Sequence, residues 1–309
     1  DAAIDGYKYI IKKNADKELV MRSRIELINT EFRQYQAAFS HDNAKLLRLE
    51  QEYLKLLDEL GKNTFTIPLI LNLAHLQAFQ LDKSDAAIQL LSEAIRIPSV
   101  PAKSQAECKL ELGDIYLFSD NPWEATLLYS QVDKSFKNEP LGHEAKFRNA
   151  KLSFYIGEFT WAQAQLDVLK AATSKLIAND AMELSLLIGD NLEEDSLAIP
   201  LKMYARADLL EFRNHNAEAL AVLDSLTTAY PAHIITANAL FKKAEIEIRN
   251  GKFRQAADYY TEIIDKYPYG LMADDAMFNL AVLLENQLNN KMKAMELYEK
   301  ILTQHPGSL

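Results

Sequence analysis

The 309 residues, 49% of them hydrophobic, can bury a large core, and with only nine Gly and nine Pro the composition favours helix almost everywhere. The formal net charge of −10 argues against a nucleic acid or an anionic membrane surface as partner, because clustered Lys and Arg bind both. The one cysteine, Cys108, excludes an intrachain disulfide and a multi-thiolate zinc site.

The chain begins at Asp1 rather than Met and stops at Leu309, just past a Pro-Gly pair. We therefore expect that a leader has been removed or that the chain is part of a longer protein. No apolar run approaches the length of about 18 residues that a membrane span needs, so this segment is expected not to insert into a membrane.

Apolar periodicity, together with Gly and Pro punctuation, predicts a succession of helices and no convincing strand. In chain order the predicted helices cover residues 2–13, 16–39, 42–60, 67–81, 84–97, 102–119, 122–136, 142–156, 159–174, 178–190, 195–214, 216–229, 233–250, 253–267, 271–288 and 291–304.

An alanine recurs in the second half of successive units, which reveals a repeat. The successive sequence intervals between these anchors are 38, 37, 57, 37 and 38, and the long interval contains one extra helix with its loop. The anchors are Ala87, Ala125, Ala162, Ala219, Ala256 and Ala294.

A second small residue precedes most anchors by twelve positions, because two antiparallel helices cross closely only where the contacting side chains are short. His75 occupies this position before Ala87 and is expected to be packed and hydrogen-bonded there. Gly157 and Gly251 lie five positions before their anchors, where a left-handed cap ends the first helix of a pair. The other small residues are Gly113, Ala150, Ala207, Ala244 and, thirteen positions before its anchor, Ala281.

This pattern resembles the tetratricopeptide repeat, whose motif places small residues at its eighth and twentieth positions and bulky residues between them. The stretch ELGDIYLFSDNPWEATLLYSQV carries the motif well, with Gly113, Tyr116, Ala125 and Tyr129 in place. The resemblance implies an all-α fold, a right-handed α-solenoid of antiparallel helix pairs. The period here, 37 or 38 along the chain, exceeds the family's usual 34, which indicates longer helices or loops.

We divide the predicted solenoid, which is continuous, into four stretches. Residues 1–65 form N-terminal helices with degenerate repeats, 66–177 and 196–309 form tetratricopeptide-like repeats, and 178–195 form an extra, unpaired helix.

Local spacing predicts no metal, cofactor or catalytic site. The six histidines never stand three or four residues apart, and Cys108 takes a repeat position that holds Ala elsewhere, so it is interpreted as apolar filler. The acidic runs at 192–195 and 273–275 are interpreted as helix-start residues that favour the helix dipole. We therefore expect a protein that is not an enzyme.

In tetratricopeptide arrays the first helices of successive repeats line a concave groove, so the resemblance implies partner-binding positions. They combine aromatic and charged residues, as peptide-binding surfaces do, although neighbouring helices of the chain could also fill the groove. Tyr155 and Tyr204 flank the extra helix, where a local pocket is predicted. The candidate partner-binding residues are Asn72, Phe118, Phe147, Lys151, Tyr155, Tyr204, Asp208, Glu211, Phe241, Glu245 and Arg249, and the mapped groove positions also include Glu107, Asp114 and Phe212.

The leading hypothesis is a non-catalytic scaffold that binds a protein or peptide, and a homo-oligomer is compatible with it. The alternative is the recruitment module of a larger enzyme or signalling protein whose catalytic domain lies outside this chain. The Lys-Asn-Asn-Lys-Arg clamp of chaperone adaptors has no counterpart here, which disfavours an acidic C-terminal tail as ligand. The stretch YPYGLMADDAMFNLAVLLE resembles bacterial cell-envelope members of the family. The periplasm or cell envelope is therefore favoured as the location of this protein, and the cytoplasm is the alternative.

Overall fold

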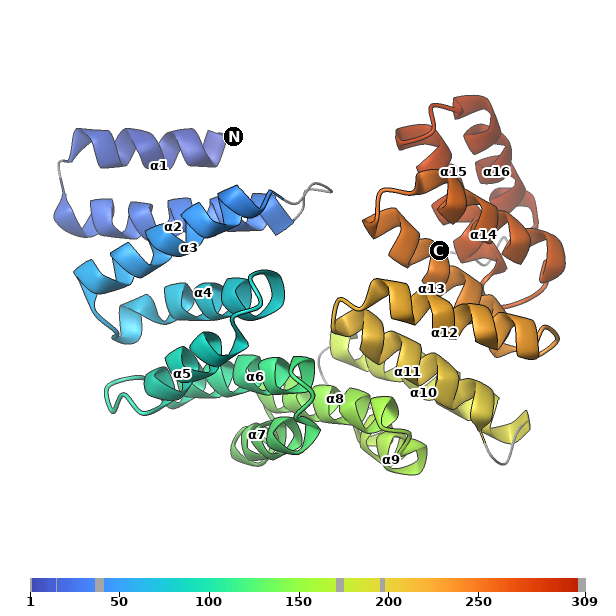
Figure 1. Cartoon of the computed structure of the whole chain (residues 1–309), viewed down its shortest axis with the longest axis horizontal. Helices are drawn as coiled ribbons and strands as arrows, with labels where there is room; N and C mark the ends of the chain where they lie inside the picture. The colour runs from blue at the N-terminus through green and yellow to red at the C-terminus, as the bar shows by residue number, and fades with distance from the viewer. Residues whose placement is uncertain (1, 15, 37–41, 171–174, 195–197, 305–309) are drawn as a thin grey trace. The chain divides into compact units, whose positions relative to one another are not determined.

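The computed structural model describes residues 2–14, 16–36, 42–170, 175–194 and 198–304. Within them the chain forms sixteen α-helices, one 3-10 helix and no β-strand (Figure 1). The all-α prediction is confirmed over this part of the chain, and each predicted helix is present. The elements are α1 (Ala2–Lys13), α2 (Lys17–Gln36), α3 (Asn43–Leu60), η1 (Thr64–Thr66), α4 (Ile67–Gln80), α5 (Ser84–Ile95), α6 (Ala102–Phe118), α7 (Pro122–Ser135), α8 (Pro140–Tyr155), α9 (Phe159–Leu169), α10 (Lys175–Glu194), α11 (Ile199–Phe212), α12 (Asn216–Ala229), α13 (Ile235–Arg249), α14 (Phe253–Lys266), α15 (Ala273–Asn286) and α16 (Lys291–Gln304).

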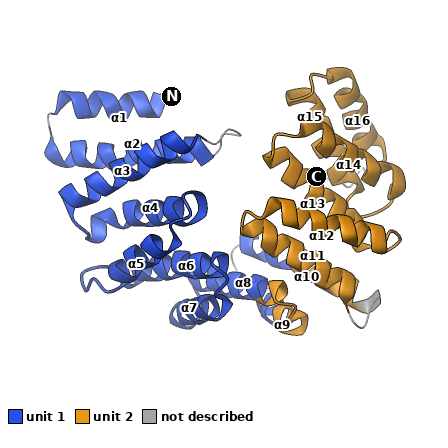
Figure 2. Ribbon diagram, in the orientation of Figure 1, with its two compact units in different colours: residues 1–152, 164–182 blue, residues 153–163, 183–309 orange. Residues whose placement is uncertain are grey.

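The chain divides into two compact units, and Figure 2 colours them separately. Unit 1 comprises residues 1–152 and 164–182, and unit 2 comprises 153–163 and 183–309. In unit 1, α4 packs on α5, α5 on α6, and α6 on α7. In unit 2 the same order runs from α11 to α16, each helix packing on the next. Each unit is therefore a stack of antiparallel helix pairs, as the solenoid prediction requires.

We call the leading helix of each pair the first helix. In unit 1 these are α2, α4, α6 and the part of α8 up to Leu152; in unit 2 they are α11, α13 and α15. Neighbouring first helices touch directly, α2 with α4, α4 with α6, and α11 with α13. We call the surface that they form the first-helix face of each unit.

The repeat register is confirmed by burial and by backbone conformation. All six anchor alanines are at most 2% exposed. The residue five positions before each anchor has a positive φ, between 51° and 82°, which is the left-handed cap expected at Gly157 and Gly251. At the other four positions Asp or Asn, which tolerate this conformation better than other side chains, replaces Gly. These four are Asp82, Asp120, Asn214 and Asn289.

The position assigned to His75 is wrong by one residue. Ala74 is fully buried, whereas the side chain of His75 is 36% exposed. The small residue of this repeat is therefore Ala74, which precedes Ala87 by thirteen positions, just as Ala281 precedes Ala294. His75 is hydrogen-bonded, as expected, but it occupies the position that follows the small residue Ala74 on α4.

The extra helix and its acidic end also differ from expectation. The predicted helix at 178–190 is α10, which is longer at both ends and accepts a hydrogen bond of 2.6 Å at Ser185 from Gln163 of α9. The backbone of residues 192–194 forms its last turn, so these residues end a helix and do not begin one, and the helix-start interpretation is wrong for them; residue 195 of the acidic run lies outside the described residues. The run at 273–275 does lie in the first turn of α15, as predicted.

Candidate partner-binding face

A cavity of about 240 Å³ opens on the first-helix face of unit 1. All of its lining residues come from α2, α4, α6 and α8, four successive first helices. One part of the lining is apolar and consists of Phe32, Leu71, Leu110 and Leu141. The other part is polar or charged and consists of Gln36, Asn72, His75, Glu107, Glu111, Glu144 and Arg148.

Most charged groups of the cavity already have partners. His75 Nδ1 lies 2.9 Å from Glu111 Oε1, which joins α4 to α6. The guanidinium of Arg148 donates to Glu144 and to Asp114, both at 2.5 Å. Within the described residues the carboxylate of Glu107 forms no ion pair or hydrogen bond, so it is the lining charge that remains available.

Asp114 does not line this cavity, but it bonds to Arg148 of the lining and links two helix pairs. The hydroxyl of Tyr129 donates to its Oδ1 at 2.7 Å, while Arg148 holds its Oδ2. Burial raises the pKa of Asp114 to about 6, and the nearby Arg148 and Tyr129 only partly offset that rise. This carboxyl therefore supports the walls of the cavity and does not offer a free charge.

In unit 2 the first-helix face carries a cluster of charges around Lys242. Its ammonium lies 3.1 Å from Asp208 and 3.2 Å from Glu211 on α11, and 3.5 Å from Glu245 on its own helix. Arg249 forms a further ion pair with Glu211. Burial disfavours the charge of Lys242, but the surrounding negative groups outweigh it and hold its pKa well above the ordinary value.

The sequence predicted the carboxylates of these clusters as site residues, but it did not predict their cationic partners, Arg148 and Lys242. It also did not predict that each ion pair joins one repeat to the next. Asp114 and Asp208 each directly follow the small residue of a first helix, and each pairs with a cation of the next repeat, Arg148 and Lys242 respectively. His75 and Glu111 occupy the same two positions, but there the imidazole is on the earlier repeat and the carboxylate on the later one. Residues of opposite charge that stand about one repeat length apart in the sequence were thus the signal from which the clusters around Arg148 and Lys242 could have been predicted.

Four of the predicted aromatic residues serve packing between helices. Tyr155 and Tyr204 are only 7% and 8% exposed, and the Tyr155 ring lies 6.2 Å from that of Phe212. The ring of Phe241 lies 5.2 Å from Tyr260 of α14. Phe118 lies 4.8 Å from Phe79 in an edge-on arrangement.

Of the other predicted positions in unit 1, Asn72 lines the cavity and donates to Asn29 of α2 at 2.8 Å. Phe147 and Lys151 are half-buried on α8 and do not line it. The structure thus brings Asn72 and Glu107 together in unit 1, and the charges of α11 and α13 together in unit 2.

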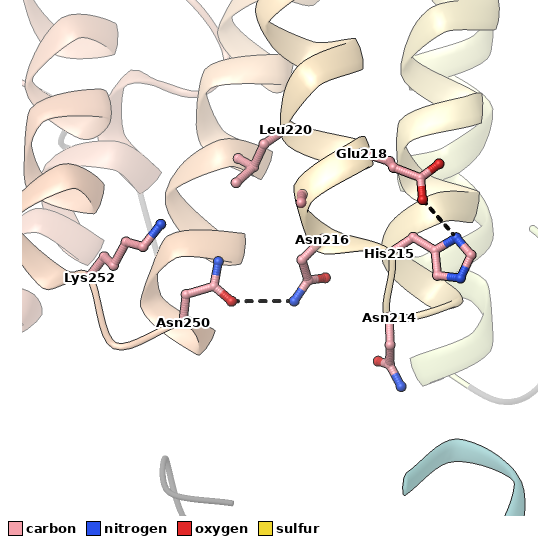
Figure 3. A pocket seen from close by; sticks show the side chains of 8 residues that line it. Asn214, His215, Asn216, Glu218, Leu220, Asn250 and Lys252 are labelled. Carbon is pink, nitrogen blue, oxygen red and sulfur yellow. Dashed lines mark hydrogen bonds and ion pairs between the residues drawn. The ribbon is translucent and has the colours of Figure 1, made fainter. Parts of the chain in front are cut away.

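A second, larger cavity of about 540 Å³ lies in unit 2 at the turns before α12 and α14 (Figure 3). In Figure 3 His215 faces Glu218, and Asn216 faces Asn250. Most of its lining side chains, including Asn214 and Lys252, are exposed. We interpret it as the open edge between two helix turns.

Cys108 is fully buried on α6, and burial raises the pKa of its thiol to about 12. This environment suits packing, because a nucleophilic cysteine needs the thiolate form. Across the described residues no three His, Cys, Asp or Glu side chains are grouped as a metal ion would require. None of the helices described is both long and apolar enough to cross a bilayer.

Comparison with known proteins identifies repeats in unit 2. Residues 241–308, from α13 onward, match the tetratricopeptide repeat family model TPR_16. A comparison with curated protein sequences gives no match.

Solved structures resemble the chain over most of its length. A tetratricopeptide repeat protein from Parabacteroides merdae ATCC 43184 is 14% identical with a TM-score of 0.38, over 91% of this chain and 93% of that one. A Rap protein complexed with competence and sporulation factor is 13% identical with a TM-score of 0.37, over 98% and 96%. The human IFIT1 dimer with m7Gppp-AAAA is 15% identical with a TM-score of 0.38, over 99% of this chain and 64% of that one. At such identities and scores these likenesses say nothing of partner or ligand.

Proposed function

We propose that this chain, a helical-repeat protein whose residues 241–308 are tetratricopeptide repeats, is a scaffold that binds a segment of a partner protein on the first-helix face of unit 1. One observation carries the proposal: four successive first helices converge on a single cavity with an apolar part and a charged part. Interfaces that bind protein segments combine an apolar centre with a polar rim in this way.

The size of the cavity favours one side chain of a longer segment over a small organic ligand. Its volume of about 240 Å³ is below the range of roughly 300–1,000 Å³ typical of small-molecule sites. A row of half-buried aromatic rings continues from it, since His75 lies 4.6 Å from Phe79, which in turn contacts Phe118. Aromatic side chains of this kind supply contact area for the neighbouring residues of a bound segment.

A protein partner is favoured over a nucleic acid by charge. Glu107, Glu111 and Glu144 line the cavity, and the single arginine there is paired with two carboxylates. Phosphate groups would be repelled from such a surface, because nucleic acids are held chiefly by unpaired Lys and Arg.

Peptide display tests the proposal. Twelve-residue random peptides displayed on phage are selected on the immobilised full chain, and the enriched peptides are measured against two tryptophan variants. Leu141→Trp fills the cavity from α8, whereas Leu127→Trp adds the same ring to an exposed position of α7, 58% exposed, outside the cavity.

We expect Leu141→Trp to weaken the selected peptides at least tenfold and Leu127→Trp to change their affinity less than twofold. Circular dichroism of both variants checks that the helices are intact. Equal binding to both variants would place the site elsewhere on the chain. A random single-stranded RNA pool is tested in parallel. If RNA binds the chain and Leu141→Trp abolishes that binding, the occupant of this face is RNA and the proposal of a protein partner is wrong.

The recruitment-module alternative uses the same face. A catalytic domain encoded in the same open reading frame as this chain would make the scaffold a recruiting part of that enzyme, so the full-length coding sequence distinguishes the two.

A further inference from the structure

We propose that the cavity of unit 1 receives a cationic side chain, the guanidinium of Arg or the ammonium of Lys, from the bound segment. This inference rests on the proposed function and names the chemistry of the residue at its centre. The partner is thus expected to be a protein segment with a basic residue next to apolar ones.

The charge balance of the lining supports a cation. Glu107, Glu111 and Glu144 contribute three carboxylates, against Arg148 as the one permanently charged cation of the lining. The charge of Arg148 is already paired with the carboxylates of Glu144 and Asp114, so an incoming anion would have to compete with both of them for the guanidinium. An incoming cation finds the unpaired carboxylate of Glu107.

The positions of these carboxylates suit the shape of a long basic side chain. Glu107 and Glu111 stand four residues apart, on one face of α6, and Leu110 lies between them in the lining. Phe32 of α2 and Leu71 of α4 add apolar surface to the lining. Arg and Lys bury their methylene stems along such apolar surface while the charged head reaches polar groups.

Arginine fits this arrangement better than lysine. Its planar guanidinium presents several N–H donors and can bond to more than one carboxylate oxygen at once. Glu111 keeps one carboxylate oxygen, Oε2, that His75 does not contact. A guanidinium between Glu107 and Glu111 would therefore have acceptors from two side chains.

A matched pair of small probes tests the inference on the full chain. N-acetyl-L-arginine amide and N-acetyl-L-citrulline amide have nearly the same shape and differ in charge. Binding is followed by NMR of ¹³C-labelled leucine methyl groups, with Leu71, Leu110 and Leu141 as reporters in the cavity and Leu127 and Leu302 as reporters outside it.

We expect the arginine probe to shift the three cavity reporters in a saturable manner and the citrulline probe to bind at least fivefold more weakly. Glu107→Gln should weaken the arginine probe at least threefold. Glu124→Gln, which removes a carboxylate from an exposed position of α7 outside the cavity, should leave its affinity unchanged.

Equal affinity of the two probes, or shifts confined to Leu127 and Leu302, would overturn the inference. Such a result is distinct from failure of the proposed function. If display-selected peptides remain sensitive to Leu141→Trp while lacking Arg and Lys, the scaffold function stands and the cationic specificity is wrong. If the selected peptides ignore Leu141→Trp, the proposed function itself is wrong.

Discussion

Gly113 of α6 and Tyr129 of α7 are so close that a methyl group on Gly113 would fall 2.4 Å from Cε1 of the tyrosine ring. Tyr129 is fully buried and its hydroxyl is bonded to Asp114, so moving the ring aside would disturb both its packing and that hydrogen bond. This contact explains why the small-residue position of this repeat holds Gly and not Ala.

The first prediction concerns Gly113→Ala. In an exposed helix interior this change stabilises by about 1 kcal/mol, because Ala has the higher helix propensity. Here we expect the opposite sign, a loss of about 1–3 kcal/mol from overpacking. Urea denaturation of the variant and the parent chain measures the difference, and a gain in stability would contradict the contact.

Combining Gly113→Ala with Tyr129→Leu identifies the cause of that loss. Leucine occupies the equivalent position in three other repeats, at Leu91, Leu166 and Leu223, where the facing small residue is alanine. The double variant should therefore lose less than the sum of the two single variants. If the losses in unfolding free energy of the two single variants simply add in the double variant, the tyrosine ring is not what destabilises Gly113→Ala.

The second prediction concerns the anchor alanines. Ala125 and Ala256 are fully buried, so replacing either with Leu should cost about 1–3 kcal/mol, again through overpacking. Gln255→Ala, one residue away on the exposed side of α14, should change stability by less than roughly 0.5 kcal/mol. Equal denaturation midpoints for the Ala256 and Gln255 variants would show that the repeat register is wrong.

The fold was largely predictable because periodic positions reveal themselves by repetition. Ala125 and Ala256 mark the same site in two repeats, and burial confirms both. His75 was misplaced because a fixed spacing of twelve positions hid a one-residue insertion. The acidic run at 192–194 was misread because nothing in its composition shows that α10 continues through it.

The candidate site was less predictable, because its groups meet across repeats. Arg148 and Lys242 lie outside the positions that the family resemblance assigns to the groove, and their partners are a full repeat away in sequence. Tyr155 and Tyr204 have the residue type expected of a binding surface, but only the packing shows that both are buried. The cavity itself requires four helices to be placed together, which no local pattern specifies.

The third prediction concerns the Lys242 cluster of unit 2. Lys242→Met would leave Asp208 and Glu211, whose side chains are only 14% and 10% exposed, without their shared cation. Removing one partner of a buried ion pair typically costs about 3–5 kcal/mol, and we expect a loss of this order in chemical denaturation. Adding Asp208→Asn and Glu211→Gln to Lys242→Met should recover part of it.

A matched surface pair provides the control. Lys266 lies 2.7 Å from Glu262, but its side chain is 63% exposed, so Lys266→Met should have little effect. Similar losses for Lys242→Met and Lys266→Met would contradict a structural role for the buried cluster.

The fourth prediction concerns pH. Because burial raises the pKa of Asp114 from 3.8 to about 6, the folded chain binds this proton more tightly than the unfolded chain does. The contribution of Asp114 to stability is therefore fully present below pH 3.8 and is lost as the pH rises through 6. Asp114→Asn cannot titrate and should lack this dependence.

The measurement is the free energy of unfolding of the parent chain minus that of Asp114→Asn, determined at pH 4, 5, 6 and 7. We expect this difference to fall with rising pH by on the order of 2–3 kcal/mol, since one unit of pKa corresponds to about 1.4 kcal/mol. A difference that stays constant or rises would show that Arg148 and Tyr129 outweigh burial.

The central claim, that a partner segment occupies the first-helix face of unit 1, is tested most directly by photo-cross-linking. A display-selected peptide carrying a benzophenone at its central position is irradiated with the full chain, and the linked residues are located by mass spectrometry. We predict links to residues of α2, α4, α6 and α8 around the cavity, with loss of these links in Leu141→Trp. Links concentrated on α5 and α7, or on unit 2, and unchanged in Leu141→Trp, would contradict it.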